Sequence, residues 1–102
     1  MRTSIATWLV LLVAFPASPS LADTKLADKK NCLACHSIDK KVLGPALKEI
    51  ATKYTGQSDA TSLLASRIKK GSTGVWGIVP MPANDVTDAE AQQLAEWVLT
   101  LK

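Results

Sequence analysis

The sequence predicts an all-α domain with four helices and one large irregular loop. Apolar residues recur at intervals of three and four in several segments, which is the spacing of amphipathic helices. Three of these segments begin near a capping residue, and two end near a glycine. No segment has the two-residue alternation typical of a strand, and residues 71–86 are interrupted by glycine and proline. We therefore expect one small helical domain.

The first 22 residues have the pattern of a cleaved secretory signal. Arg2 provides a basic start, Ile5–Phe15 is apolar, and Ser20-Leu21-Ala22 places small residues where a signal peptidase cuts. A membrane anchor is the alternative, but this apolar run has only about half of the roughly 20 residues that a spanning helix needs. We expect cleavage after Ala22, export to the periplasm, no stable membrane association, and a mature domain of residues 23–102.

The first two expected helices lie on either side of the only two cysteines. Asp23 or Thr24 can cap a short helix that leads to Cys32. A second helix is predicted to begin with Pro45 in its first turn, where the missing N–H does no harm, and to end at Gly56. Its apolar face consists of Leu47, Ile50, Ala51 and Tyr54.

Two further helices flank a long loop. Ser58 or Asp59 can cap the third helix, which Gly71 ends. Thr87 and Glu90 form a capping-box pattern at the start of the fourth helix. The apolar stripe of that helix consists of Leu94, Trp97, Val98 and Leu101, and we interpret Trp97 and Tyr54 as core residues. A loop as long as 71–86 in a small domain usually has a function.

The motif with the clearest chemistry is Cys32-Leu-Ala-Cys35-His36. On one helical turn, residues three and four apart point to the same side, so both thiols and the imidazole face one object. The thiols can form thioether bonds with the two vinyl groups of a porphyrin while the imidazole binds its iron, and C-x-x-C-H is the attachment pattern of c-type haem. The sequence therefore predicts one covalently bound haem c.

Other interpretations of the cysteine pair compete with haem. A zinc site needs four ligands, and residues 23–102 contain no further Cys or His. A thioredoxin-like site needs a βαβ framework, which the helical pattern lacks. A small disulfide loop, or an exported dithiol oxidoreductase using Cys32 and Cys35 with His36 adjusting the thiol pKa, stays open as the rival. This rival leaves Met81 and Trp76 without a role.

Met81 is the candidate for the second axial position on the iron. It is the only methionine of residues 23–102 and lies between Pro80 and Pro82, which restrict the backbone and should stiffen this part of the loop. Packing is the ordinary role of methionine, but Met81 does not lie on an apolar helical stripe. Ligation by His36 and Met81 would fill both axial positions and raise the reduction potential. An electron carrier is predicted rather than an oxygenase or peroxidase.

Five short motifs follow one another along residues 32–84: Cys32-Leu-Ala-Cys-His36, Leu43-Gly-Pro45, Arg67-Ile-Lys-Lys-Gly71, Gly74-Val-Trp-Gly77 and Pro80-Met-Pro-Ala-Asn84. In this order they resemble the short bacterial class I monohaem cytochromes c of the c-551/c-552 type. The resemblance covers essentially all of residues 23–102. It implies a small cytochrome c fold with about four helices around one covalent haem. It also implies a carrier of single electrons between respiratory-chain donors and a terminal reductase or oxidase, nitrite reductase among them.

The resemblance also assigns individual roles. It implies that His36 and Met81 are the axial ligands and that the Pro45 carbonyl accepts the other imidazole N–H. It also implies that Trp76 and Arg67 donate hydrogen bonds to a haem propionate. Asn84 is implied to lie near the methionine sulfur. Four of these residues also have ordinary structural explanations. These are a solvated helix charge for Arg67, core packing for Trp76, a turn for Asn84, and a helix start for Pro45.

Charge indicates little about partners by itself. Of the 12 basic residues only Arg2 lies in the first 22, so 11 remain beside all 9 acidic residues. Lysines concentrate in residues 25–70, and a ring of them around an exposed haem edge could steer an acidic redox protein into transient contact. A merely soluble surface is the alternative. Without a nucleic-acid recognition motif we expect no nucleic-acid partner, and we expect a monomer.

Overall fold

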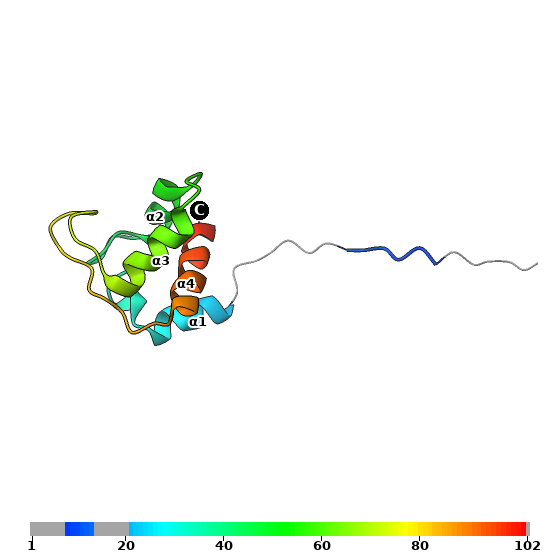
Figure 1. Cartoon of the computed structure of the whole chain (residues 1–102), viewed down its shortest axis with the longest axis horizontal. Coiled ribbons are helices and arrows are strands. Elements are labelled where there is room, and N and C mark those ends of the chain that lie inside the picture. The colour runs from blue at the N-terminus through cyan, green and yellow to red at the C-terminus, as the bar shows by residue number, and fades with distance from the viewer. Residues whose placement is uncertain (1–7, 14–20, 102) are drawn as a thin grey trace, which may run out of the picture.

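The computed structural model describes residues 8–13 and 21–101, with only the backbone for Leu21 and Ala22. The elements follow in the order α1 (Leu21–Lys29), a 3-10 turn η1 (Cys32–Ala34), α2 (Leu47–Tyr54), α3 (Ala60–Lys70) and α4 (Asp88–Thr100) (Figure 1). Within the described ranges no strand forms, and one isolated antiparallel bridge joins Ser72 to Met81. The prediction of an all-α domain is confirmed.

The predicted signal lies largely outside the described residues. Its described part, Trp8–Val13, is exposed and has no regular secondary structure. Cleavage after Ala22 stays a prediction. In the described part of the chain, no helix combines the length and the apolar character that crossing a bilayer requires.

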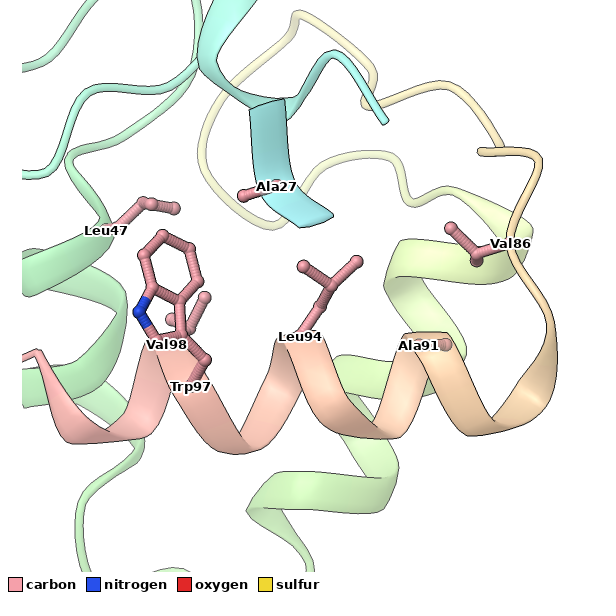
Figure 2. Close-up of a cluster of buried hydrophobic side chains, with 7 residues drawn as sticks. All are labelled: Ala27, Leu47, Val86, Ala91, Leu94, Trp97 and Val98. Atoms are coloured by element: carbon pink, nitrogen blue, oxygen red, sulfur yellow. The ribbon is translucent and has the colours of Figure 1, made fainter. Parts of the chain in front are cut away.

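Helix α4 is the scaffold of the domain, because α1, α2 and α3 all pack against it. Figure 2 shows Ala27 of α1 and Leu47 of α2 directed toward Leu94 and Trp97 of α4. Val86, Ala91 and Val98 complete this buried cluster. Burying one large apolar side chain contributes about 1.5–3 kcal/mol, so this cluster is a main source of stability. Trp97 is thus a core residue, as predicted.

A second buried cluster lies where α2, α3 and α4 meet. Tyr54, Ala60, Leu64 and Ala95 are its buried members. Trp76, which comes from the long loop, packs against it. The core interpretation of Tyr54 is confirmed, since its side chain is only 4% exposed. The cluster therefore connects the loop to the helical scaffold.

The boundaries of α3 and α4 agree with the predicted caps. Asp59 is the N-cap residue of α3, although its side chain makes no capping hydrogen bond, and Gly71 ends the helix with φ 80°. At α4 the Thr87 hydroxyl accepts from the Glu90 N–H at 3.1 Å, and the Thr87 N–H donates to Glu90 Oε1 at 3.0 Å. That backbone hydrogen bond is the main reason why the pKa of Glu90 is lowered. The capping box is confirmed.

The starts of α1 and α2 were predicted wrongly. Helix α1 begins at Leu21, and the Asp23 carboxylate accepts a hydrogen bond from Gln93 Nε2 of α4 at 2.6 Å instead of capping the helix. Pro45 lies outside α2, whose N-cap residue is Ala46. The reason lies in the backbone after His36: its carbonyls at Ser37 and Ile38 accept from the first N–H groups of α2, at 2.9 and 3.1 Å. Helix α2 therefore starts where the segment after His36 supplies these hydrogen-bond acceptors.

Candidate haem-binding site

The two cysteines lie on one tight helical turn. Asn31 precedes the turn with a left-handed backbone, φ 61°. The N–H groups of Cys35 and His36 both donate to the Cys32 carbonyl, at 3.2 and 3.0 Å. Both thiols are free, and both side chains are partly buried. The turn thus has the hydrogen bonds expected if both thiols and the imidazole share one side.

The Cys32 thiol is not tuned as a nucleophile. Burial is the largest influence on it and raises its pKa, although a backbone hydrogen bond acts in the opposite direction. Reactive dithiol sites depend on thiols whose pKa is lowered, so that the thiolate is available at neutral pH. This observation disfavours the dithiol oxidoreductase.

The imidazole of His36 is held from the side of Pro45. Its Nδ1 donates to the Pro45 carbonyl oxygen at 2.7 Å, which leaves the lone pair on Nε2 for another partner. Gly44 lies against the ring so closely that a Cβ there would be 2.6 Å from Cε1. The N–H of Gly44 donates to the Cys35 carbonyl at 2.8 Å. The turn around Gly44 therefore fixes both the tautomer and the orientation of the ring.

The backbone of Met81 is fixed by the end of α3. Ser72 and Met81 exchange two backbone hydrogen bonds, of 3.0 and 2.9 Å. Gly71 supports this contact, because a Cβ at its position would be 2.6 Å from the Met81 carbonyl oxygen. After Met81, the chain is anchored by buried Val86. The loop that carries the predicted second ligand is thus tied at both ends.

Asn84 contributes to the same anchorage. Its Nδ2 donates to the Ile68 carbonyl in the last turn of α3 at 2.8 Å, and to the Pro82 carbonyl at 3.3 Å. The amide therefore ties the chain after Met81 to α3. The expected place beside the methionine sulfur stays a prediction.

Arg67 contacts Tyr54, and Trp76 packs against the buried cluster that contains Tyr54. Arg67 Nη1 donates to the Tyr54 hydroxyl, and its guanidinium carbon is 5.5 Å from the centroid of that ring. The Lys53 ammonium lies 4.4 Å from the Trp76 ring centroid and 5.7 Å from that of Tyr54. Among the described residues, neither Arg67 nor Lys53 forms a salt bridge with a carboxylate. A guanidinium without a carboxylate partner suits a ligand that brings its own carboxylate.

Large apolar side chains remain exposed next to both candidate ligands. Val42 and Leu43 precede the turn that holds His36, and Ile78 and Val79 precede Met81. Each is more than half exposed. A bound apolar group next to the two candidate ligands would cover side chains of this kind. Two free thiols, an imidazole with an available nitrogen, a thioether and this apolar surface fit haem c.

Some contacts at the site were not anticipated from the sequence. They are the close approaches of Gly44 to His36 and of Gly71 to Met81, the Ser72 bridge, and the place of Lys53 over Trp76. Gly44 and Gly71 belong to the motifs that carry the resemblance to the cytochromes c, so the sequence did contain a signal that these two glycines matter. The sequence contained no such signal for Ser72 or Lys53, because a contact between distant segments leaves no local pattern.

Comparison with known proteins shows the family of this chain. A family model for cytochrome c matches residues 24–102. The chain belongs to the cytochrome c family. It is 58% identical over 82 residues to cytochrome c-552 of Nitrosomonas europaea, covering 79% of this chain and 80% of that protein. It is 50% identical over 95 residues to cytochrome c-552 of Hydrogenobacter thermophilus, covering 93% and 97%.

The fold is similar as well. The crystal structure of wild-type Nitrosomonas europaea cytochrome c552 matches this cytochrome with a TM-score of 0.76 at 57% identity, over 78% of this chain and 99% of that one. The predictions of a class I monohaem cytochrome c with a small helical fold and one covalently bound haem c are confirmed. The protein is an electron-transfer protein rather than an enzyme.

Proposed function

We propose that residues 23–102 form a periplasmic carrier of single electrons in which Cys32 and Cys35 bind haem c covalently and His36 and Met81 bind its iron. The observation that carries this proposal is the 2.7 Å hydrogen bond from His36 Nδ1 to the Pro45 carbonyl, which leaves Nε2 available as a ligand. When bound, the haem supplies an iron that gains or loses one electron. Pro45, as predicted from the family resemblance, then orients the ligand and raises its basicity.

Met81 is proposed as the second ligand because contacts within the protein fix its backbone. The bridge to Ser72 and the close contact with Gly71 set where the residue lies. A thioether in the second axial position raises the reduction potential and leaves no open site for oxygen or peroxide. Asn84, which bonds the Ile68 carbonyl, supports the loop from the other end.

Trp76 and Arg67 are proposed to hydrogen-bond a haem propionate. Arg67 contacts Tyr54, and Trp76 packs against the cluster that contains Tyr54. Among the described residues, Trp76 makes no side-chain hydrogen bond, so its indole N–H remains available to an acceptor. The guanidinium of Arg67 and the indole N–H of Trp76 would together stabilise a carboxylate.

Partner proteins are proposed to dock at the exposed segment that follows His36. Lys40 and Lys41 are exposed and directly precede the exposed apolar residues Val42 and Leu43. Positive charge beside apolar surface favours fast, short-lived contact with an acidic redox protein. The donors would be respiratory-chain proteins, and the acceptors a terminal reductase or oxidase such as nitrite reductase. The carrier itself would be a monomer.

An optical spectrum of the mature protein, made in a host that attaches haem, tests the ligation. Sharp bands on reduction, colour that survives acid–acetone extraction, and a weak band near the red end of the ferric spectrum would support covalent attachment and a methionine sulfur on the iron. Covalent haem without the red-end band would remove Met81 from the proposal. A colourless protein with two free thiols would favour dithiol chemistry instead. N-terminal sequencing after export should find Asp23 as the first residue.

A further inference from the structure

The outer half of the loop between Ser72 and Met81 has a single anchor. At its tip Ile78 is 98% exposed. The loop contains four large apolar residues, Val75, Trp76, Ile78 and Val79, and of these only Trp76 packs against a buried cluster. The bridge between Ser72 and Met81 closes the base of the loop. What holds Trp76 in place therefore also holds the outer half of the loop.

The ammonium of Lys53 covers the indole of Trp76. Its Nζ lies 4.4 Å from the ring centroid, inside the distance of about 6 Å at which a cation is attracted to an aromatic face. In the described part of the chain Lys53 has no carboxylate partner, whereas Lys48 on the same helix pairs with Asp39 at 2.7 Å. The partners of the Lys53 charge are thus the faces of Trp76 and Tyr54.

We propose that Lys53 is a positioning residue whose contact with Trp76 latches the loop 72–81 onto α2 and so sets how readily Met81 leaves the iron. The proposal rests on the proposed ligation by His36 and Met81. The outer half of the loop can open locally, because Gly74 and Gly77 on either side of Trp76 have φ of 72° and 130°, and local opening of loops with few contacts costs little. Once the outer half is free, the bridge between Ser72 and Met81 loses that support, so Met81 is held less firmly. A competing ligand binds only the open form, so its apparent affinity increases with the open fraction.

Titration with imidazole tests the latch. The ferric, haem-loaded mature protein is titrated while the weak red-end band, which reports the methionine sulfur on iron, is followed. For Lys53→Gln we expect imidazole to bind about two- to fivefold more tightly, the ratio that corresponds to loss of one exposed cation–π contact. Lys53 is exposed and glutamine is a good helix former, so the variant should keep its fold and its band without imidazole.

Two control variants separate the latch from other effects. Lys53→Arg keeps a cation able to cover the indole and should bind imidazole like the wild type. Lys48→Gln removes the same charge from the groove that Lys48, Lys53 and Trp76 line, and should also leave the affinity unchanged. Equal shifts for Lys53→Gln and Lys48→Gln would show a general charge effect and overturn the latch, as would equal shifts for both Lys53 variants.

The same titration distinguishes failure of the latch from failure of the proposed ligation. If the wild type has no red-end band, Met81 is not a ligand and both proposals are overturned. If the wild type has the band and imidazole abolishes it, but Lys53→Gln titrates like the wild type, only the latch is overturned.

Discussion

His36 and Met81, the two proposed iron ligands, are held in different ways. His36 is fixed by contacts close in sequence: the turn from Cys32, the close approach of Gly44, and the Pro45 carbonyl nine residues away. Met81 is fixed by contacts with distant segments. Asn84 reaches Ile68 across 16 residues, and Trp76 of the loop packs against the cluster that contains Tyr54. One ligand belongs to a local motif, and the other depends on the folded domain.

The difference indicates which ligand gives way first. Local unfolding begins where buried contacts are few, and the loop 72–81 has an exposed tip and one apolar anchor. The His36 side adds two proposed covalent bonds to its hydrogen bonds. We therefore expect perturbations of the Met81 side to change ligation while attachment survives, and perturbations of the His36 side to affect the whole haem-loaded protein.

The largest contrast is expected between His36→Ala and Met81→Ala. Without His36 the attachment turn loses its ligand, and little haem-loaded protein should accumulate. Met81→Ala should retain covalent haem, lose the red-end band, and have a reduction potential lower by on the order of 0.1 V or more, because the thioether no longer stabilises ferrous iron. Spectra and potentiometric titration measure both outcomes. Equal yields with unchanged spectra would contradict the assigned ligands.

A smaller contrast is expected between the two glycines that contact the ligand segments. Gly71→Ala places a Cβ 2.6 Å from the Met81 carbonyl oxygen on a backbone with φ 80°, so steric clash and backbone strain add up. We expect a loss of about 2–4 kcal/mol in the free energy of unfolding and a weakened red-end band.

Gly44→Ala should act on the other ligand. Its Cβ would lie 2.6 Å from His36 Cε1, so the ring must shift, but no left-handed backbone is involved. We expect a loss of about 1–3 kcal/mol with the red-end band retained. Denaturant unfolding of the ferric protein, followed by both the haem absorbance and circular dichroism, measures each loss. If Gly44→Ala removed the band and Gly71→Ala kept it, the comparison would be reversed.

The same contrast decides what the sequence alone can predict. The turn from Cys32 to His36, the glycine that ends α3 and the capping box at Thr87 are local patterns, and the structure contains all three. The start of α1 was missed because Asp23 bonds Gln93, which is 70 residues away in the sequence. Pro45 was wrongly predicted to lie inside α2. The true start of the helix depends on the carbonyls after His36, which accept from its first N–H groups, and this contact cannot be seen in the local sequence.

The candidate site divides along the same line. Residue types and spacing were enough to propose Cys32, Cys35, His36 and Met81. They could not show that Arg67 donates to Tyr54 or that Lys53 covers Trp76, because these residues come together only when α2, α3 and the loop pack. Helix periodicity identifies which face of each helix is apolar, but it does not say which distant residue will lie against it.

Asn84→Ala should weaken only the Met81 side. The variant loses the hydrogen bond to the Ile68 carbonyl, which contributes about 1 kcal/mol to the stability of the folded state. We expect the unfolding free energy to fall by about that amount and imidazole to displace Met81 more readily. Gln92→Ala, which removes an exposed amide paired with Glu96 on α4, is the matched control and should change neither quantity. Identical effects of the two variants would show that Asn84 does not anchor the loop.

The smallest expected effect concerns acid stability at the start of α4, where the chain leaves the Met81 loop. The pKa of Glu90 is lowered mainly by the hydrogen bond from the Thr87 N–H, and the pKa of Asp88 is lowered mainly by its hydrogen bond with Lys69. A carboxyl group with a lowered pKa in the folded state stabilises the fold above its unfolded pKa. That contribution is lost as the pH falls through the folded value, because the unfolded chain takes up the proton first.

The expected loss of stability toward acid can be tested by measuring the free energy of unfolding between about pH 6 and pH 3. This window spans the ordinary carboxyl pKa range near 4. Glu90→Gln keeps an oxygen that can accept from the Thr87 N–H but removes the titrating group, so its stability should decline less steeply toward acid than that of the wild type. Because this cap lies at the exit of the Met81 loop and far in sequence from His36, the wild-type red-end band should weaken in acid before covalent attachment is affected. A steeper acid decline for Glu90→Gln would mean that the folded pKa of Glu90 is not lowered.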